Sequence, residues 1–143
     1  MTALLSLHLP YEEKGELADV AAGYGVDIIS LIAPTSEQRI QQIAKEATGF
    51  IYVVSSMGVT GMRSEIKTDL QAILEVVKGS SSIPTAVGFG INTPKQAGEI
   101  AKITDGVIVG SAIVKLIEKH GEKAGSYIYE YVRSMKNAVR ELD

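Results

Sequence analysis

The sequence predicts an α/β fold of five parallel strand–helix units. Short, almost uninterruptedly apolar runs alternate with amphipathic stretches, as in parallel strands buried on both faces and joined by helical crossovers. The expected strands are Ala3–Leu7, Asp27–Ile32, Phe50–Val54, Thr85–Val87 and Gly106–Val109. The expected helices are Glu12–Tyr24, Glu37–Thr48, Thr68–Lys78, Pro94–Ile103 and Tyr127–Leu142. No shift in composition marks a second domain, so we expect a single α/β domain over residues 1–143.

Capping residues support the expected helix boundaries. Thr93 is an N-cap residue followed by proline at the first helical position, and Thr35-Ser36-Glu37 opens the second helix in a similar way. Gly25 and Gly79 stand where helices are expected to end, as left-handed C-cap residues do. Each helical stretch also carries apolar residues at three- and four-residue spacing, which predicts one buried face per helix.

Composition and charge restrict the class of protein. A hydrophobic content of 45% is typical of a globular chain, and a net charge of −3 argues against a broad nucleic-acid surface. The chain has no cysteine and two histidines, so we expect no metal site, and we expect no cofactor. No apolar run approaches the roughly 20 residues of a membrane span. We therefore expect a cytoplasmic protein without membrane or nucleic-acid partners.

Three consecutive strands open into glycine-containing turns, Ser55–Gly61, Gly88–Thr93 and Gly110–Val114. In parallel α/β folds ligands bind at this end of the strands. Glycine lets the backbone approach a ligand closely, and amides at a following helix N-terminus bind anions. The short helix expected over Ser111–Ile117 would add such amides and a serine hydroxyl. A single turn of this kind ordinarily only reverses the chain. Three on one rim predict a site for phosphate or a phosphorylated small molecule.

Five segments resemble, in order and spacing, the tryptophan synthase alpha subunit family. They are Leu31–Thr35, Phe50–Ser55, Gly58–Gly61, Val87–Ile91 and Asp105–Val114, and Leu9–Glu13 resembles the family's segment after its fourth strand. The resemblance covers nearly the whole chain from about Leu9 onward. It implies five units, from about the fourth strand, of a TIM-type (β/α)8 barrel. It also implies a lyase of tryptophan biosynthesis that cleaves indole-3-glycerol phosphate to indole and glyceraldehyde 3-phosphate.

The resemblance implies roles for the matched positions. The substrate phosphate would be held by Gly61, Gly90, Gly110 and Ser111. Tyr52 and Phe89 would border the substrate. Ser55–Lys67 would be a mobile loop that closes over the site, with Thr60 as a contact. The resemblance alone implies a PLP-dependent beta subunit as a partner. Much of the family's interface with that subunit would lie on strands absent from this chain.

The resemblance also implies that the first three barrel strands, with the family's catalytic glutamate and aspartate, are absent. We match no residue here to either role, so we expect no catalytic residue and no lyase activity from the chain alone. Where the family has Pro-Asp-Leu-Pro, this chain reads Leu7-His8-Leu9-Pro10. His8 has a pKa suited to proton transfer, although a solvated strand-end histidine is the ordinary interpretation. His120 is expected on the surface.

Five units leave two edge strands, for which we consider two arrangements. In one, self-association or a complementary fragment completes a barrel. In the other, the chain forms an open five-stranded flavodoxin-like sheet, with helices on both faces and its first strand near the centre. The apolar Ala3–Leu7 slightly favours the second arrangement.

Three functional hypotheses remain at this stage. The chain is an alpha-type lyase that works only when the missing half is supplied, or a non-catalytic phosphate-binding module or engineered barrel-fragment scaffold, or a domain whose glycines only make turns. Glycine-rich loops near a sheet's switch point would also suit a flavin. No residue specifically requires an isoalloxazine ring.

Overall fold

The computed structural model describes residues 2–5, 13–55, 63–88 and 90–140 of the chain. Within these ranges, five strands form one parallel sheet in sequential order, β1-β2-β3-β4-β5. The strands are β1 (Thr2–Leu5), β2 (Val26–Ile32), β3 (Ile51–Val54), β4 (Thr85–Gly88) and β5 (Gly106–Val107). The five parallel units expected from the sequence are therefore confirmed, as one open sheet.

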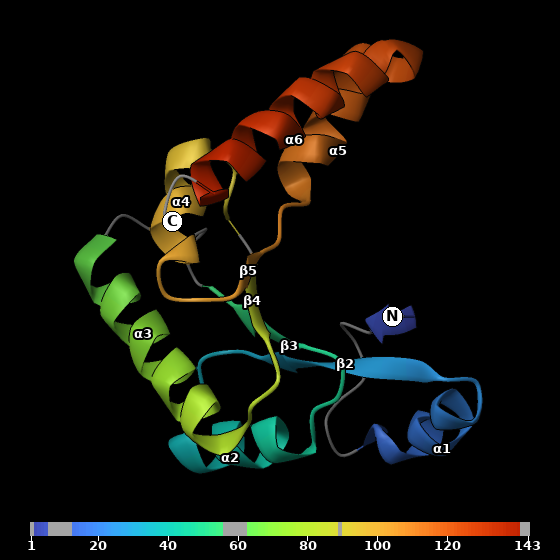
Figure 1. Ribbon diagram of the computed structural model, residues 1–143, viewed down its shortest axis with the longest axis vertical. Helices are drawn as coiled ribbons and strands as arrows, with labels where there is room; N and C mark the ends of the chain where they lie inside the picture. The colour runs from blue at the N-terminus through green and yellow to red at the C-terminus, as the bar shows by residue number, and fades with distance from the viewer. Residues whose placement is uncertain (1, 6–12, 56–62, 89, 141–143) are drawn as a thin grey trace.

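The helices follow one another around one side of this sheet (Figure 1). They are α1 (Gly15–Gly23), α2 (Glu37–Glu46), α3 (Arg63–Ser80), α4 (Pro94–Ala101), α5 (Ser111–His120) and α6 (Ala124–Arg140). The short 3-10 turn η2 (Gly121–Lys123) joins α5 to α6, and these two helices lie side by side beyond β5. The later part of α6 packs on α4 (Figure 1). No described helix has the length and apolar character needed to cross a membrane.

The strand order decides between the two arrangements considered for the sheet. A flavodoxin-like order would place the first strand near the centre, but β1 lies at the edge and pairs with β2. Leu4 and Leu5 are 44% and 42% exposed there, so the apolar opening did not indicate a central strand. Each crossover leads to the adjacent strand. Crossovers between parallel strands are almost always right-handed, which gathers the helices on one side. The sheet is thus an arc of a barrel.

The core lies between this sheet and helices α2, α3, α4 and α6. Ile32, Ile51 and Val53 are fully buried on the strands and face the apolar stripes predicted for the second and third helices. The helical part of the core comprises Ile40, Ile43, Ala44, Leu70, Ile73, Leu74, Val77, Ala97, Ile100 and Met135. Each large apolar side chain buried in this layer contributes about 1.5–3 kcal/mol relative to exposure. The core therefore fixes the rim that carries the candidate site.

The caps agree with the sequence except at one position. Ser36 accepts a hydrogen bond from the Arg39 amide, and Thr93 forms the expected N-cap. Gly25 has a φ of 65° after α1, as expected. Gly79 instead lies inside α3, which runs to Ser80, so its prediction as a C-cap was wrong. Bonds from Ser80 Oγ to the Val76 carbonyl and from the Ser81 amide to the Val77 carbonyl extend that helix end beyond the glycine.

Candidate functional site

A cavity of about 470 Å³ lies at the carboxyl ends of β3, β4 and β5. Four of the residues predicted to bind substrate line it together: Tyr52, Gly90, Gly110 and Ser111. Its remaining wall is formed by Ile91, Asn92, Ile108, Ala112, Lys115, Leu116 and Tyr131. Residues from three strand–helix units and from the last helix thus meet at one place. Which ligand they hold stays a prediction.

The other predicted residues cannot be placed in the same way. Gly61, Thr60, Phe89 and His8 lie outside the described residues. Part of the loop expected over Ser55–Lys67 is described and differs from the prediction. Residues 63–67 already belong to α3, while Ser55 is buried and its amide donates to the Gly88 carbonyl at 2.9 Å. Ile66 and Leu70 are four residues apart, a spacing that suits one face of a helix, so the loop prediction extended too far.

Tyr52 reaches the cavity from β3 across a glycine of the next strand. Its side chain is only 7% exposed, and burial raises the pKa of its hydroxyl, which stays protonated at neutral pH. The ring lies so close to Gly88 that a Cβ on this residue would overlap the Tyr52 hydroxyl and ring carbons. Gly88 is therefore required by close packing, because any side chain there would displace Tyr52.

The turn after β4 is held by side-chain bonds to its backbone. Gly90 has a φ of 74°, in the left-handed region that favours glycine. Gln96 Oε1 accepts from the amides of Asn92 and Thr93, both at 3.1 Å, and the Gln96 amide donates to Thr93 Oγ1 at 3.2 Å. This reciprocal capping box opens α4 and fixes the turn beside the cavity.

The start of α5 supplies backbone donors to the same cavity. Gly110 is the N-cap, and its carbonyl accepts from the amides of Ile113 and Val114 at 2.9 and 3.1 Å. The first turn of a helix carries amides without acceptors inside the helix, and the cavity wall includes Ser111 and Ala112 of that turn. A Cβ on Gly110 would meet no atom within 4 Å, and its φ of −126° is not in the left-handed region that favours glycine. Neither close packing nor a positive φ therefore requires glycine at this position.

Sequence reasoning missed Lys115 and Tyr131 as parts of this cavity. Lys115 stands four residues after Ser111 in α5, and this spacing places two side chains on one helix face. That signal could have identified a positive charge beside the predicted anion site. Tyr131 comes from α6, and its hydroxyl donates to the Asn92 carbonyl at 2.9 Å. Burial raises the pKa of Tyr131. No short-range pattern in the sequence links Tyr131 to Asn92.

Two polar side chains outside this cavity, those of His120 and Lys14, contact other residues of the chain. His120 is half-buried and stacks on Tyr127 with ring centroids 3.6 Å apart, so it is less exposed than expected. Beside β2, Lys14 Nζ donates to Ser30 Oγ at 3.1 Å and to the Glu46 carbonyl at 3.4 Å. Desolvation lowers the pKa of Lys14, while Glu46 opposes that effect. Across the described ranges, histidine and acidic side chains form no group of three that could hold a metal ion.

Comparison with known proteins gives one family. Residues 1–140 match the family model described as tryptophan synthase alpha chain. The tryptophan synthase alpha chain of Lacticaseibacillus casei is 51% identical over 131 residues, covering 92% of this chain and 49% of that protein. The corresponding chain of Lactiplantibacillus plantarum is 46% identical over 140 residues, covering 97% and 53%.

Solved structures agree. Tryptophan synthase subunit alpha from Campylobacter jejuni has a TM-score of 0.79 at 30% identity and covers 100% of this chain and 54% of its own. A structure of the tryptophan synthase α2β2 complex from Pyrococcus furiosus has a TM-score of 0.78 at 28% identity, covering 96% and 55%. The chain thus spans about half the length of the relatives and solved chains that it matches.

Proposed function

The chain belongs to the tryptophan synthase alpha chain family, and we propose that its cavity at the carboxyl ends of β3, β4 and β5 binds the phosphate group of a phosphorylated small molecule. The observation that carries the proposal is the convergence of Gly90, Gly110 and Ser111 on one cavity. Backbone amides at a helix start attract an anion without any charged side chain. Lys115 adds one positive charge at the wall.

Gly110 separates this proposal from the view that the glycines only make turns. Its φ is negative and a Cβ would meet no neighbour, so neither a left-handed backbone nor close packing demands glycine. A bare Cα beside the first amides of α5 leaves the approach to those amides open. A ligand that comes close to the backbone would account for glycine at this position.

By family resemblance, the ligand is indole-3-glycerol phosphate. We propose that this chain supplies the binding half of the alpha-type lyase and does not turn the substrate over alone. Among the described residues that line the cavity, none carries a carboxylate or an imidazole. The retro-aldol cleavage needs a proton donor and acceptor near the indole ring. The hydroxyls of Tyr52 and Tyr131, whose pKa values burial raises, remain protonated at neutral pH and are poor proton acceptors.

A beta subunit enters the proposal at family level. The Pyrococcus furiosus neighbour is described as part of a tryptophan synthase α2β2 complex. We propose a beta subunit as the protein partner of the complete alpha unit to which this half corresponds. Binding measured with this half alone and then with the complementary half present would locate the contact.

Thermal unfolding with glycerol phosphate or inorganic phosphate tests the binding proposal. A ligand that binds only the folded chain should stabilise it by about 2.7 kcal/mol at a hundredfold excess over Kd. Gly110→Leu should fold normally but lose this stabilisation, because its side chain covers the amides. Gly125→Leu is the matched control, since Gly125 also has open space around its Cα and lies outside the cavity. Chloride at equal ionic strength controls for salt. An unshifted transition with both phosphates would refute the proposal.

A second experiment tests the lyase part. The chain would be co-expressed with a fragment carrying the first three strand–helix units of an alpha chain. Restored cleavage of indole-3-glycerol phosphate, lost again in Gly110→Leu, is the expected result. Phosphate-dependent stabilisation without turnover in a folded complex would instead indicate a non-catalytic phosphate-binding module.

A further inference from the structure

The backbone of Asn92 is held from two opposite directions. Its amide donates to Gln96 Oε1 at 3.1 Å, and its carbonyl accepts from the Tyr131 hydroxyl at 2.9 Å. Gln96 belongs to α4, whereas Tyr131 lies 39 residues further along the chain in α6. Asn92 itself is exposed and stands two residues after Gly90, and both line the 470 Å³ cavity. An exposed turn is thus tied to two separate helices.

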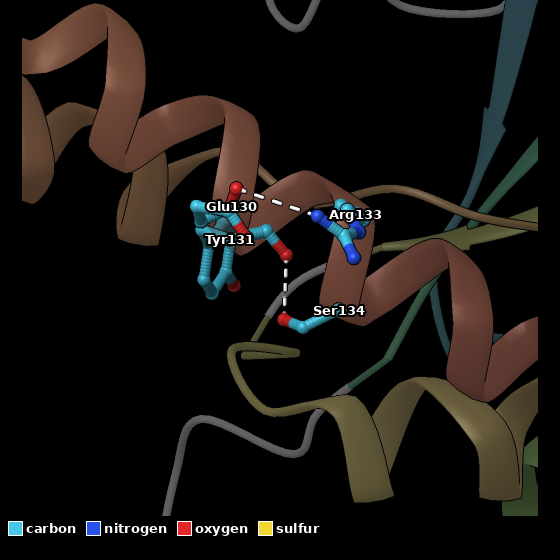
Figure 2. Close-up of polar contacts among 4 residues, drawn as sticks. All are labelled: Glu130, Tyr131, Arg133 and Ser134. Carbon is cyan, nitrogen blue, oxygen red and sulfur yellow. Dashed lines mark hydrogen bonds and ion pairs between the residues drawn. The ribbon is translucent and has the colours of Figure 1, made fainter.

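The position of Tyr131 is itself well determined. Figure 2 shows the Ser134 hydroxyl bonded to the Tyr131 carbonyl at 2.7 Å, one turn further along α6, with the Glu130–Arg133 ion pair of the same helix beside it. The Tyr131 side chain is half-buried and packs against the core cluster. It also lines a second, mainly apolar cavity of about 320 Å³ between β5, α4 and α6. Its ring therefore separates two hollows, with the hydroxyl facing the turn.

The Tyr131 hydroxyl is not what docks α6. Gly98 of α4 lies so close to α6 that a Cβ on it would stand 3.0 Å from the Ala138 carbonyl oxygen. Met135 is buried in the core, and Val139 packs against it. These contacts belong to the same helix and hold it without any help from a phenol. The hydroxyl is therefore available for a task at the turn.

We propose that Tyr131 is a positioning residue of the phosphate site, which fixes the Gly90–Asn92 turn where it lines the cavity. This inference rests on the proposed function. A turn that is already ordered does not have to be ordered when the anion arrives, so more of the interaction appears as affinity. Gln96 is the second positioning residue, because its Oε1 accepts a hydrogen bond from the amide of the same residue.

Tyr131→Phe tests the proposal, because it removes the hydroxyl and keeps the ring. Tyr129→Phe is the matched control on the same helix, since Tyr129 is 64% exposed and does not line the cavity. Affinity for inorganic phosphate and glycerol phosphate would be measured by titration. Without ligand, amide hydrogen exchange would be measured at Gly90 and Asn92. Tyr131→Phe should weaken binding roughly three- to tenfold and speed exchange at the turn, as loss of one neutral hydrogen bond predicts. The control should change neither.

Gln96→Ala provides a second, independent variant. It should weaken binding by a similar factor, and the double variant should lose less than the product of the two factors, because both side chains hold one turn. Far-UV circular dichroism would establish that each variant is folded.

The outcomes separate the two proposals. Wild-type binding that survives Tyr131→Phe unchanged would overturn the positioning role and leave the phosphate site standing. Absence of wild-type binding would overturn the proposed function and, with it, a phosphate-positioning role. Fast exchange in Tyr131→Phe would then identify the bond as purely structural. Equal weakening by Tyr129→Phe would also overturn the assignment.

Discussion

The two ends of the parallel sheet use their polar groups differently. At the amino ends of β4 and β5, Thr85 is 1% exposed, and its hydroxyl donates to Asp105 Oδ2 at 3.0 Å. The Thr85 amide donates to the same oxygen at 2.9 Å, and the Thr104 hydroxyl donates to the Thr85 carbonyl at 3.0 Å. Each of these donors has an acceptor within the chain, and the resulting network closes on itself.

At the carboxyl ends, the same strands lead into the 470 Å³ cavity, whose wall includes Gly90, Gly110 and the first residues of α5. The side chains that do bond here, Gln96 and Tyr131, hold the turn at Asn92. The amides in the first turn of α5 have no acceptor inside the helix. The polar groups at the amino ends thus bond to one another, whereas at the carboxyl ends we propose that backbone amides bind a ligand.

Among these substitutions, we expect Gly88→Val to lower the free energy of unfolding most. Gly88→Val places a side chain where the Tyr52 ring lies, so it should cost about 3 kcal/mol in the free energy of unfolding, at the upper end of overpacking penalties. Urea unfolding would measure this cost. Gly110→Val is the control and should leave the unfolding midpoint unchanged, since space is open there. Equal costs at both positions would mean that glycine is structural along the whole rim.

Thr85→Val, at the amino end of β4, should lower stability without changing phosphate affinity. It replaces the buried hydroxyl with a methyl group and leaves the Thr104 hydroxyl and Asp105 without this partner, which should cost about 2 kcal/mol. Phosphate affinity, measured by titration at a temperature where the variant is folded, should not change. Thr35→Val, at an exposed position, is the control. A large loss of affinity in Thr85→Val would show that the two ends are coupled.

The pH dependence of stability should identify Asp105. The hydrogen bond from the Thr85 amide lowers the pKa of Asp105 below its ordinary 3.8. Desolvation opposes this effect, and the Thr85 hydroxyl and the charge of Lys78 reinforce it. Because the folded pKa is depressed, the contribution is fully present above that ordinary value. It is lost as the pH falls through the lower folded pKa. Asp105→Asn should remove this dependence in urea unfolding between pH 6 and acid conditions, roughly pH 2.5. The effect should be small, because Asp105 is exposed.

The smallest expected effect concerns Lys115. Lys115→Ala should leave stability unchanged and weaken phosphate binding roughly twofold to fivefold, as exposed charge pairs do. The difference should shrink at high salt, where exposed charges are screened. Lys119→Ala, one turn further along α5 and outside the cavity, should behave like the wild type. Titration at two ionic strengths would check both expectations.

Local patterns allowed much of the fold to be predicted. Apolar runs identified the strands, and Ser36 and Thr93 identified helix starts, because these signals act between near neighbours in the sequence. The strand order could not be predicted, because edge and central strands can both be apolar, and Leu4 and Leu5 lie at an edge. The glycines of the site were found because they follow strands. Tyr131 was missed because its partner is 39 residues away.

The sequential strand order has a consequence for how the chain folds and opens. Each strand pairs with the strands before and after it in the sequence, and helices mainly contact helices of neighbouring units. Such an arrangement behaves like a one-dimensional array, in which each unit is stabilised by its contacts with the neighbouring units. The short β1, with one neighbour and exposed leucines, is the natural place for fraying to begin. The cavity lies toward the other end of the array. Unfolding that starts at the first unit would therefore disrupt the cavity last.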